Sequence, residues 1–165
     1  MITKPEIETR KEQHTLGIRK PVPMSELKNV IPAYSHEVFQ FLKACNIAPA
    51  GPSFLRFHVI DMAGNMDVEI GVIVPKGTPG EGKIVPGTIP AGRYATLIYT
   101  GLDGYQASRT LMEWAQKKGV TWDRWDDPHG DAFRSRIELS LNDPAAEPDV
   151  KKWETLVAIK QADRQ

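Results

Sequence analysis

The chain has 165 residues, of which 41% are hydrophobic and 25% charged, and its 21 Lys and Arg balance its 21 Asp and Glu. This composition is typical of one folded, soluble domain and excludes a disordered segment. The charge balance argues against nucleic acid as a partner, because phosphate backbones are bound by clustered Lys and Arg in excess.

Neither a membrane span nor a secretory signal is visible in the sequence. The longest apolar stretches are only as long as a strand, and the first residues lack a charged segment followed by an apolar one. Cys45 is the only cysteine, which excludes an intrachain disulfide and a thiolate zinc site. A single free thiol fits a reducing compartment, so we expect a cytoplasmic protein.

The first half of the chain predicts one helix followed by two strands. Val38, Phe39 and Leu42 recur at helical spacing, and the β-branched and aromatic residues after them favour strands. A segment rich in Gly and Pro ends this half as a surface connector. The predicted elements are a polar, irregular segment at 6–19 with a strand end at 15–18, a helix over about 32–45, strands at 54–60 and 66–74, and the connector at 75–82.

The second half repeats this order. Leu111, Trp114 and Ala115 mark one face of a helix that stops at Gly119. A loop rich in Trp and Asp follows the helix, and two more strands end the chain. The predicted elements are a strand at 92–99, a turn at 101–104, a helix over 105–119, a loop at 120–131, and strands at 134–141 and 153–160.

Strand, helix, strand and strand therefore occur twice, which makes an internal repeat the most informative feature of the organisation. One repeat alone leaves a sheet face exposed, whereas two can bury their edges against each other. We expect an α+β fold in which two pseudo-symmetric strand–helix–strand–strand repeats form one antiparallel sheet with two main helices and a central cleft. The chain is predicted to be a single domain over 1–165, with repeat one at about 1–80 and repeat two at about 81–165.

Two carboxylates fall at matching places in the last strand of each repeat. Glu69 and Glu154 both lie on the strand face opposite the aliphatic row, and burying a carboxylate is unfavourable unless a partner compensates it. One interpretation is a wetted sheet face, or ion pairs with Arg56 and Arg136 on the corresponding face of neighbouring strands. The other is that Glu154 lies at the bottom of the cleft, where it attracts cationic groups on an apolar ligand.

Aromatic side chains at strand ends and in the Trp-rich loop would border such a cleft. Flat rings together with a carboxylate suit a planar cation. The candidate ligand-binding residues are Glu154, Glu69, Arg56, His58, Tyr94, Tyr99, Tyr105, Trp125, Phe133 and Arg136.

Other kinds of site have little support in the sequence. None of the four histidines pairs with a carboxylate at the spacing of helical metal sites, so we predict no metal. Cys45 ends a helix without a nearby His, and no Gly-x-Ser-x-Gly motif occurs, which argues against nucleophilic catalysis. The glycines at 77–82 lack the Gly-Lys-Ser/Thr ending of a phosphate loop. We therefore expect no cofactor.

Several segments together carry a family resemblance. Residues 152–159 read Lys-Trp-Glu-Thr-Leu-Val-Ala-Ile and follow an acidic loop at 141–149. Earlier segments agree in the same order, and the set spans nearly the whole chain. They are the stretches at 50–58, 67–72, 90–96 and 99–101. The chain resembles GyrI-like small-molecule-binding domains, which are similar to the effector-binding domains of AraC- and MerR-type transcription regulators.

The resemblance implies a duplicated strand–helix–strand–strand fold with a ligand cleft between the halves. It also implies a hydrophobic, often cationic, aromatic ligand and a buried Glu in the last strand as its charge partner. That role falls on Glu154 in the Trp-Glu-Thr motif. The turn at 101–105 departs from the Gly-Pro-Tyr or Gly-His-Pro pattern of many relatives, which puts a ligand contact from this turn in doubt. Full regulators carry a helix-turn-helix domain, and since the repeat fills this chain we expect no DNA-binding domain in it.

Three functions remain open from the sequence. The first is a binding module that senses or sequesters a hydrophobic, cationic aromatic small molecule without turning it over. The second is a hydrolase of strained, cyclopropane-containing aromatic metabolites, which some GyrI-like proteins resemble, with Glu154 as the base and Glu69 or Tyr94 as assistant. The third is a modulator of another protein, since the namesake group of the family includes inhibitors of DNA gyrase. A protein partner or a homodimer stays open, and neither nucleic acid nor a membrane is expected as a direct partner.

Overall fold

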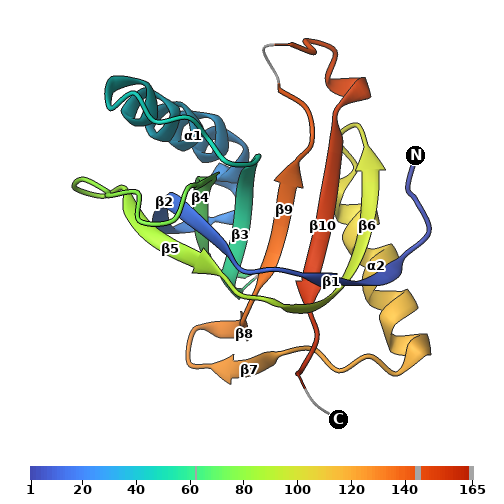
Figure 1. The fold of residues 1–165 in the computed structure, drawn as a ribbon. Coiled ribbons are helices and arrows are strands. Elements are labelled where there is room, and N and C mark those ends of the chain that lie inside the picture. Colours follow the sequence, from blue (N-terminus) through green and yellow to red (C-terminus); the bar gives the residue numbers. More distant parts are fainter. Residues whose placement is uncertain (62, 144–145, 164–165) are drawn as a thin grey trace.

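The computed structural model describes residues 1–61, 63–143 and 146–163 (Figure 1). The helices are α1 (Leu27–Ala44) and α2 (Gly104–Lys118), with two short 3-10 turns, η1 (Met24–Glu26) and η2 (Val150–Lys152). The strands are β1 (Glu6–Arg10), β2 (Gln13–Pro23), β3 (Ser53–Ile60), β4 (Asn65–Val74), β5 (Val85–Ile89), β6 (Gly92–Thr100), β7 (Arg124–Asp127), β8 (Gly130–Phe133), β9 (Arg136–Ser140) and β10 (Glu154–Lys160). Pro144 and Ala145, in the acidic loop before the last strand, lie outside the described residues.

The order of the strands in the sheet confirms the internal repeat. Antiparallel neighbours run in the order β1-β6-β10-β9-β3-β4-β2-β5. Each half contributes three main strands, of which the second lies next to the other half, the last lies in the middle and the first lies farthest from the other half. These strands are β3, β4 and β2 in one half and β9, β10 and β6 in the other. The predicted α+β fold of two strand–helix–strand–strand repeats is therefore confirmed.

Helix α1 begins earlier than the sequence predicts, at Leu27 instead of about residue 32. Pro32, expected in the first turn, lies inside the helix. Because proline has no backbone N–H, one hydrogen bond of the helix is lost there. Leu27 and Ile31 precede the proline and pack against a buried cluster that contains Val68. Because most helix stability in proteins comes from such packing, the extra turn forms despite the proline.

Helix α2 agrees with the prediction at both ends. The side chain of Asp103 accepts a hydrogen bond from the backbone N–H of Gln106 and caps the first turn. Gly119 ends the helix in the left-handed conformation, with φ of 72°, which glycine adopts without a steric penalty.

Four strands lie in segments for which the sequence predicts no strand. Within the described ranges, β1 pairs only with β6, and β5 pairs only with β2. Strands β7 and β8 form a hairpin inside the expected Trp- and Asp-rich loop, where Arg124 forms ion pairs with Asp126 and Asp131. Edge strands and short hairpins bury few side chains, and a hydrophobic pattern therefore does not report them.

Cross-strand pairing places both helices on the same face of the sheet, because directly paired residues of antiparallel strands share a face. One row of paired residues crosses six strands. It runs through Leu97 (β6), Val157 (β10), Glu138 (β9), Leu55 (β3), Ile70 (β4) and Ile18 (β2). Leu111 of α2 packs over the β6–β10 end of this row, and Val38 of α1 packs over the β2–β4 end. Figure 1 shows the two helices apart, at opposite ends of the sheet.

The opposite face has a core of its own. Phe54, Ile73, Ile89, Tyr94 and Leu139 form one buried cluster there. The sheet curls until β1 and β5 pass across this side in front of the central strands (Figure 1). The two faces of the central strands therefore have distinct surroundings.

No helix in the described part of the chain combines the length and the apolar character needed to cross a membrane.

Candidate functional site

The centre of the helix-bearing face is covered by neither helix. In the six-strand row, the four outer residues are at most 3% exposed, whereas Glu138 and Leu55 between them are partly exposed. Central strands are flanked by other strands on both sides. A side chain on such a strand is therefore exposed only where no helix or loop covers that face of the sheet. We call this surface the central strip. It consists of Leu55, Phe57, Arg136, Glu138 and Ser140, all partly exposed.

Glu138 is the carboxylate of the central strip. The Tyr99 hydroxyl donates a hydrogen bond to Glu138 Oε1 at 3.0 Å. Burial raises the pKa of the Glu138 carboxyl above its usual value, and the hydrogen bond from Tyr99 and the charge of Arg136 oppose this rise. Burial, and then the negative charge of Glu138, also raise the pKa of Tyr99. The tyrosine therefore stays protonated and remains a donor to the carboxylate.

The first turn of α2 lies against this pair. A Cβ atom on Gly104 would lie 3.0 Å from the Tyr99 hydroxyl and 3.7 Å from Glu138 Oε1. Glycine thus allows the helix to begin close to the carboxylate, where the partial positive charge of a helix N-terminus favours an anion. Tyr105, a predicted ligand contact, is the next residue and is 69% exposed.

Arg136 shares the central strip with Glu138 but contacts an aromatic ring. Its guanidinium carbon lies 4.8 Å from the centroid of the Phe133 ring. Burial lowers the pKa of Arg136, and the charges of Glu138 and Asp131 oppose this. Among the described residues, Tyr99 supplies the hydrogen bond to Glu138 and no ion pair joins it to Arg136.

Glu154 does not occupy the buried position in a cleft that the sequence predicts for it. It is the first residue of β10, it is exposed, and its backbone N–H donates to the side-chain oxygen of Asn142. Arg136 is not its neighbour, because Arg136 pairs with Ile159 at the other end of β10. The expectation that Glu154 lies buried at the bottom of a cleft is wrong. The strand starts at the residue itself, so the side chain projects at the end of the sheet.

Tyr94 is a core residue and does not form the wall of a cleft. It has no exposed surface, and its hydroxyl donates to the Pro90 carbonyl at 2.6 Å. The sequence places it near a strand end, but the curl of the sheet covers that end with the cluster around Ile89.

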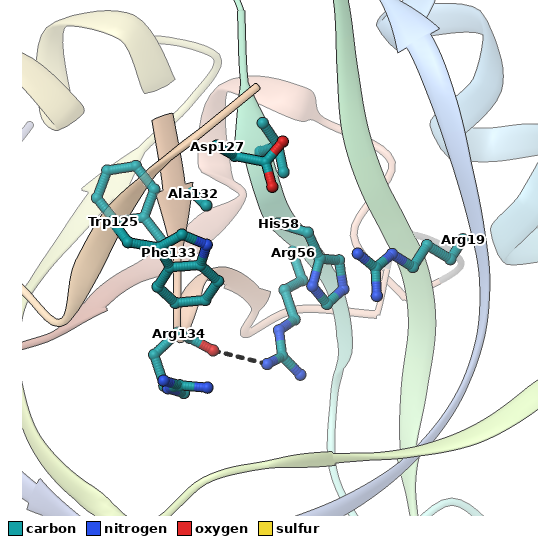
Figure 2. A pocket seen from close by; sticks show the side chains of 9 residues that line it. Arg19, Arg56, His58, Trp125, Asp127, Ala132, Phe133 and Arg134 are labelled. Atoms are coloured by element: carbon teal, nitrogen blue, oxygen red, sulfur yellow. Dashed lines mark hydrogen bonds between the residues drawn. The ribbon is translucent and has the colours of Figure 1, made fainter. Parts of the chain in front are cut away.

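The other predicted residues gather on the face opposite the helices. His58 Nε2 lies 2.8 Å from Glu69 Oε1, and the Glu69 residue is 7% exposed. Beside this pair lies a cavity of about 290 Å³, shown in Figure 2. Its lining consists of Arg19, Arg56, His58, Val59, Trp125, Asp127, Ala132, Phe133 and Arg134.

The predicted site residues therefore do not form one cleft. Tyr99 and Arg136 belong to the helix-bearing face, whereas Arg56, His58 and Trp125 line the cavity of the other face. Phe133 borders the cavity as well, but its side chain also packs in the core beneath α2 and against Arg136. No cluster of three or more His, Cys, Asp or Glu able to hold a metal ion occurs in the described part of the chain.

Comparison with known families identifies the fold. The model of the GyrI-like small molecule binding domain matches residues 3–160. The chain belongs to this family. No curated protein sequence is similar enough to this GyrI-like domain to count as a relative.

Solved structures share the fold at low sequence identity. The C-terminal domain of EcmrR is 22% identical, with a TM-score of 0.77 and 98% of each chain covered. EcmrR in a complex with DNA is 21% identical, with a TM-score of 0.78, covering 98% of this chain. The GyrI-like domain spans 58% of the length of that EcmrR chain.

Two further neighbours are described by what they do or bind. A hydrolase from Listeria innocua is 12% identical, with a TM-score of 0.63 and coverage of 96% of this chain and 92% of its own. SAV2435, solved bound to tetraphenylphosphonium, is 11% identical, with a TM-score of 0.61 and coverage of 97% and 94%. At these identities the likeness shows the fold alone.

The sequence of the GyrI-like domain does contain a signal for Glu138. Ile137 and Leu139 alternate with Arg136, Glu138 and Ser140, so a polar row lies on one side of the strand. From this polar row the sequence prediction takes only Arg136 and leaves out Glu138. A polar row on a strand at the centre of the sheet is the signal that would have indicated Glu138 as a candidate.

Proposed function

We propose that this GyrI-like domain binds a hydrophobic, cationic aromatic molecule on the central strip, with Glu138 as its charge partner. The partial exposure of Glu138 and Leu55 within an otherwise buried row carries the proposal. A ligand lying on the strip would remove apolar surface from water, as the helices do at both ends of the row.

The chemistry of the strip suits an apolar cation. Leu55 and Phe57 supply apolar and aromatic surface from β3, and Glu138 supplies a carboxylate from β9. A cation that carries aromatic substituents can contact both, through apolar burial, cation–π attraction and charge. The tetraphenylphosphonium in the similarly folded SAV2435 supports this class of ligand.

Isothermal titration calorimetry with two ions of the same shape tests the proposal. Tetraphenylphosphonium should bind with a Kd on the order of micromolar, and tetraphenylborate, its anionic counterpart, about ten-fold more weakly or not at all. Equal affinity for both ions would show that the charge of the ligand does not contribute to binding. Failure of both to bind would overturn the proposal as a whole.

Binding of tetraphenylphosphonium should also depend on pH. Only the ionised carboxylate attracts a cation, so affinity should fall as the pH is lowered through the raised pKa of Glu138. This window lies above the ordinary carboxyl value of 4.5. Titrations from about pH 8 to about pH 5 would measure the slope. A Glu138→Gln variant should bind with little dependence on pH over this range, and a slope that persists in the variant would assign the effect to another group.

A further inference from the structure

The cavity opposite the helices has features of a ligand site that the central strip does not share. It lies between two separate parts of the fold. Arg19, Arg56 and His58 come from β2 and β3, and Trp125 comes from the β7–β8 hairpin. Figure 2 shows these side chains on two sides of an open space.

Positive charge dominates the lining of this cavity. Three guanidinium groups, from Arg19, Arg56 and Arg134, face one carboxylate, from Asp127. The central strip differs, because it combines one carboxylate, Glu138, with one guanidinium, Arg136.

Two of the three arginines already have acidic partners. Arg19 donates to both carboxylate oxygens of Asp67, at 3.0 and 2.8 Å. Arg134 Nε lies 3.7 Å from Asp123 Oδ1, and its guanidinium lies over Trp125, 4.8 Å from the ring centroid. Its side chain is 57% exposed.

Arg56 differs from both. It is only 9% exposed, and two of its nitrogens donate to main-chain carbonyls, those of Thr88 at 2.9 Å and Arg134 at 2.8 Å. Its Nε has no hydrogen-bond partner among the described residues. Burial lowers the pKa of Arg56, and the charge of its cross-strand neighbour Glu69 opposes this.

The Glu69 carboxylate does not complete the hydrogen bonding of Arg56. It accepts from His58 at 2.8 Å instead. The Arg56 Nε is buried from solvent, so a ligand in the cavity would meet the two terminal nitrogens, each of which has a second N–H besides the one that donates to a carbonyl. A buried guanidinium whose hydrogen bonds go to neutral carbonyls is unfavourable unless negative charge lies near it. Carboxylates and phosphates are the groups whose geometry matches a guanidinium.

We propose that this cavity is a second binding site, for a small organic anion. The carboxylate or phosphate of the ligand would lie against Arg56 and Arg134, with Arg19 close by, and its apolar part against Trp125 and Val59. The volume of about 290 Å³ is at the lower end for ligand pockets, which fits a single-ring compound. The site does not depend on the function proposed for the central strip, since it lies on the other face.

Calorimetric titration with benzoate and phenyl phosphate tests the site, with benzyl alcohol and benzamidine as the neutral and cationic controls. We expect at least one anion to bind with a Kd of about 1 mM or lower and both controls to bind more weakly. The preferred anion distinguishes a carboxylate ligand from a phosphate ligand. Absence of binding by both anions at concentrations ten-fold higher, or tighter binding of benzamidine, would overturn the proposal.

Variants locate the anion. Arg134→Gln removes an exposed side chain and leaves the carbonyl that Arg56 uses, so the fold should persist. It should weaken the binding of the anion by about five-fold or more. Arg109→Gln makes the same charge change on α2, where Arg109 is exposed and pairs with Glu113, and should leave binding unchanged. Equal weakening by both variants would show a general charge effect and overturn the site. Glu138→Gln should not alter anion binding, so failure of one proposed site is distinguishable from failure of the other.

Discussion

Replacing Glu138 by Gln should weaken the binding of tetraphenylphosphonium by about ten- to hundred-fold, because a charge-assisted contact in a partly buried site contributes about 1.5–3 kcal/mol. Gln has the same shape as Glu and keeps an oxygen that can accept from the Tyr99 hydroxyl, now 3.0 Å from Glu138 Oε1. The substitution therefore removes the charge and leaves the packing of the central strip in place. Calorimetry of the two proteins under the same conditions measures the difference.

Glu154→Gln is the matched control for this experiment. It makes the same chemical change at an exposed residue outside the strip, and it should change the affinity less than two-fold, a difference of about 0.4 kcal/mol. The reverse result, with loss of binding in Glu154→Gln and none in Glu138→Gln, would return the charge partner to the position that the family resemblance implies. Thermal unfolding of both variants would show that neither result reflects a loss of fold.

The fold could be predicted from the sequence because its two halves repeat the same order of buried elements. The strands at 54–60, 66–74 and 92–99 are rich in β-branched and aromatic residues, and the structure contains each of them as β3, β4 and β6. Strands β1 and β5 lie at the two edges of the sheet, and partners distant in the chain hold them in place. Their positions follow from pairing, which a local pattern does not contain.

The site could be predicted less well, for a physical reason. Alternation assigns residues to one of two faces, but it does not say which stretch of a face a helix covers. Glu69, Glu138 and Glu154 all stand in strands beside apolar residues. Only the packing of the helices near the ends of the sheet leaves Glu138 open to a ligand, while Glu69 is turned to His58 and Glu154 to the exterior.

The central strands carry both proposed sites. Along β3, Leu55 and Phe57 point to the central strip, whereas Arg56 and His58 point to the cavity on the other face. Two ligands of opposite charge would thus lie on two sides of one strand, with only backbone and alternate side chains between them. The curl of the sheet gives each face its own surroundings. Strands β2 and β4 approach each other closely where Gly17 pairs with Gly71.

Gly71→Ala should destabilise the fold more than the matching substitution on the facing strand, Gly17→Ala. Gly71 of β4 pairs with Gly17 of β2, and a Cβ at residue 71 would lie 2.1 Å from the Leu16 carbonyl oxygen and 2.8 Å from the Gly17 Cα. Both obstacles are backbone atoms, so β2 itself would have to move. Overpacking of this kind costs about 3 kcal/mol, which exceeds the roughly 0.4–1 kcal/mol that alanine contributes by restricting the unfolded chain. For a chain of this size the loss corresponds to a fall in Tm of roughly 6–12 °C, measurable by circular dichroism.

Gly17→Ala is the control on the facing strand. Its Cβ would lie 2.7 Å from Glu69 Oε2, 3.0 Å from Glu69 Cγ and 3.1 Å from the Ile70 carbonyl oxygen. The nearest obstacle is a side chain that can shift, so the loss of stability should be smaller, about 2 kcal/mol. That shift would break the 2.8 Å contact between Glu69 and His58. If Gly17→Ala lowered the Tm as much as Gly71→Ala does, the approach of the two backbones would not be what limits this position. Gly71→Ala should lose more stability because the Leu16 carbonyl belongs to a paired strand and cannot move without shifting the backbone of β2.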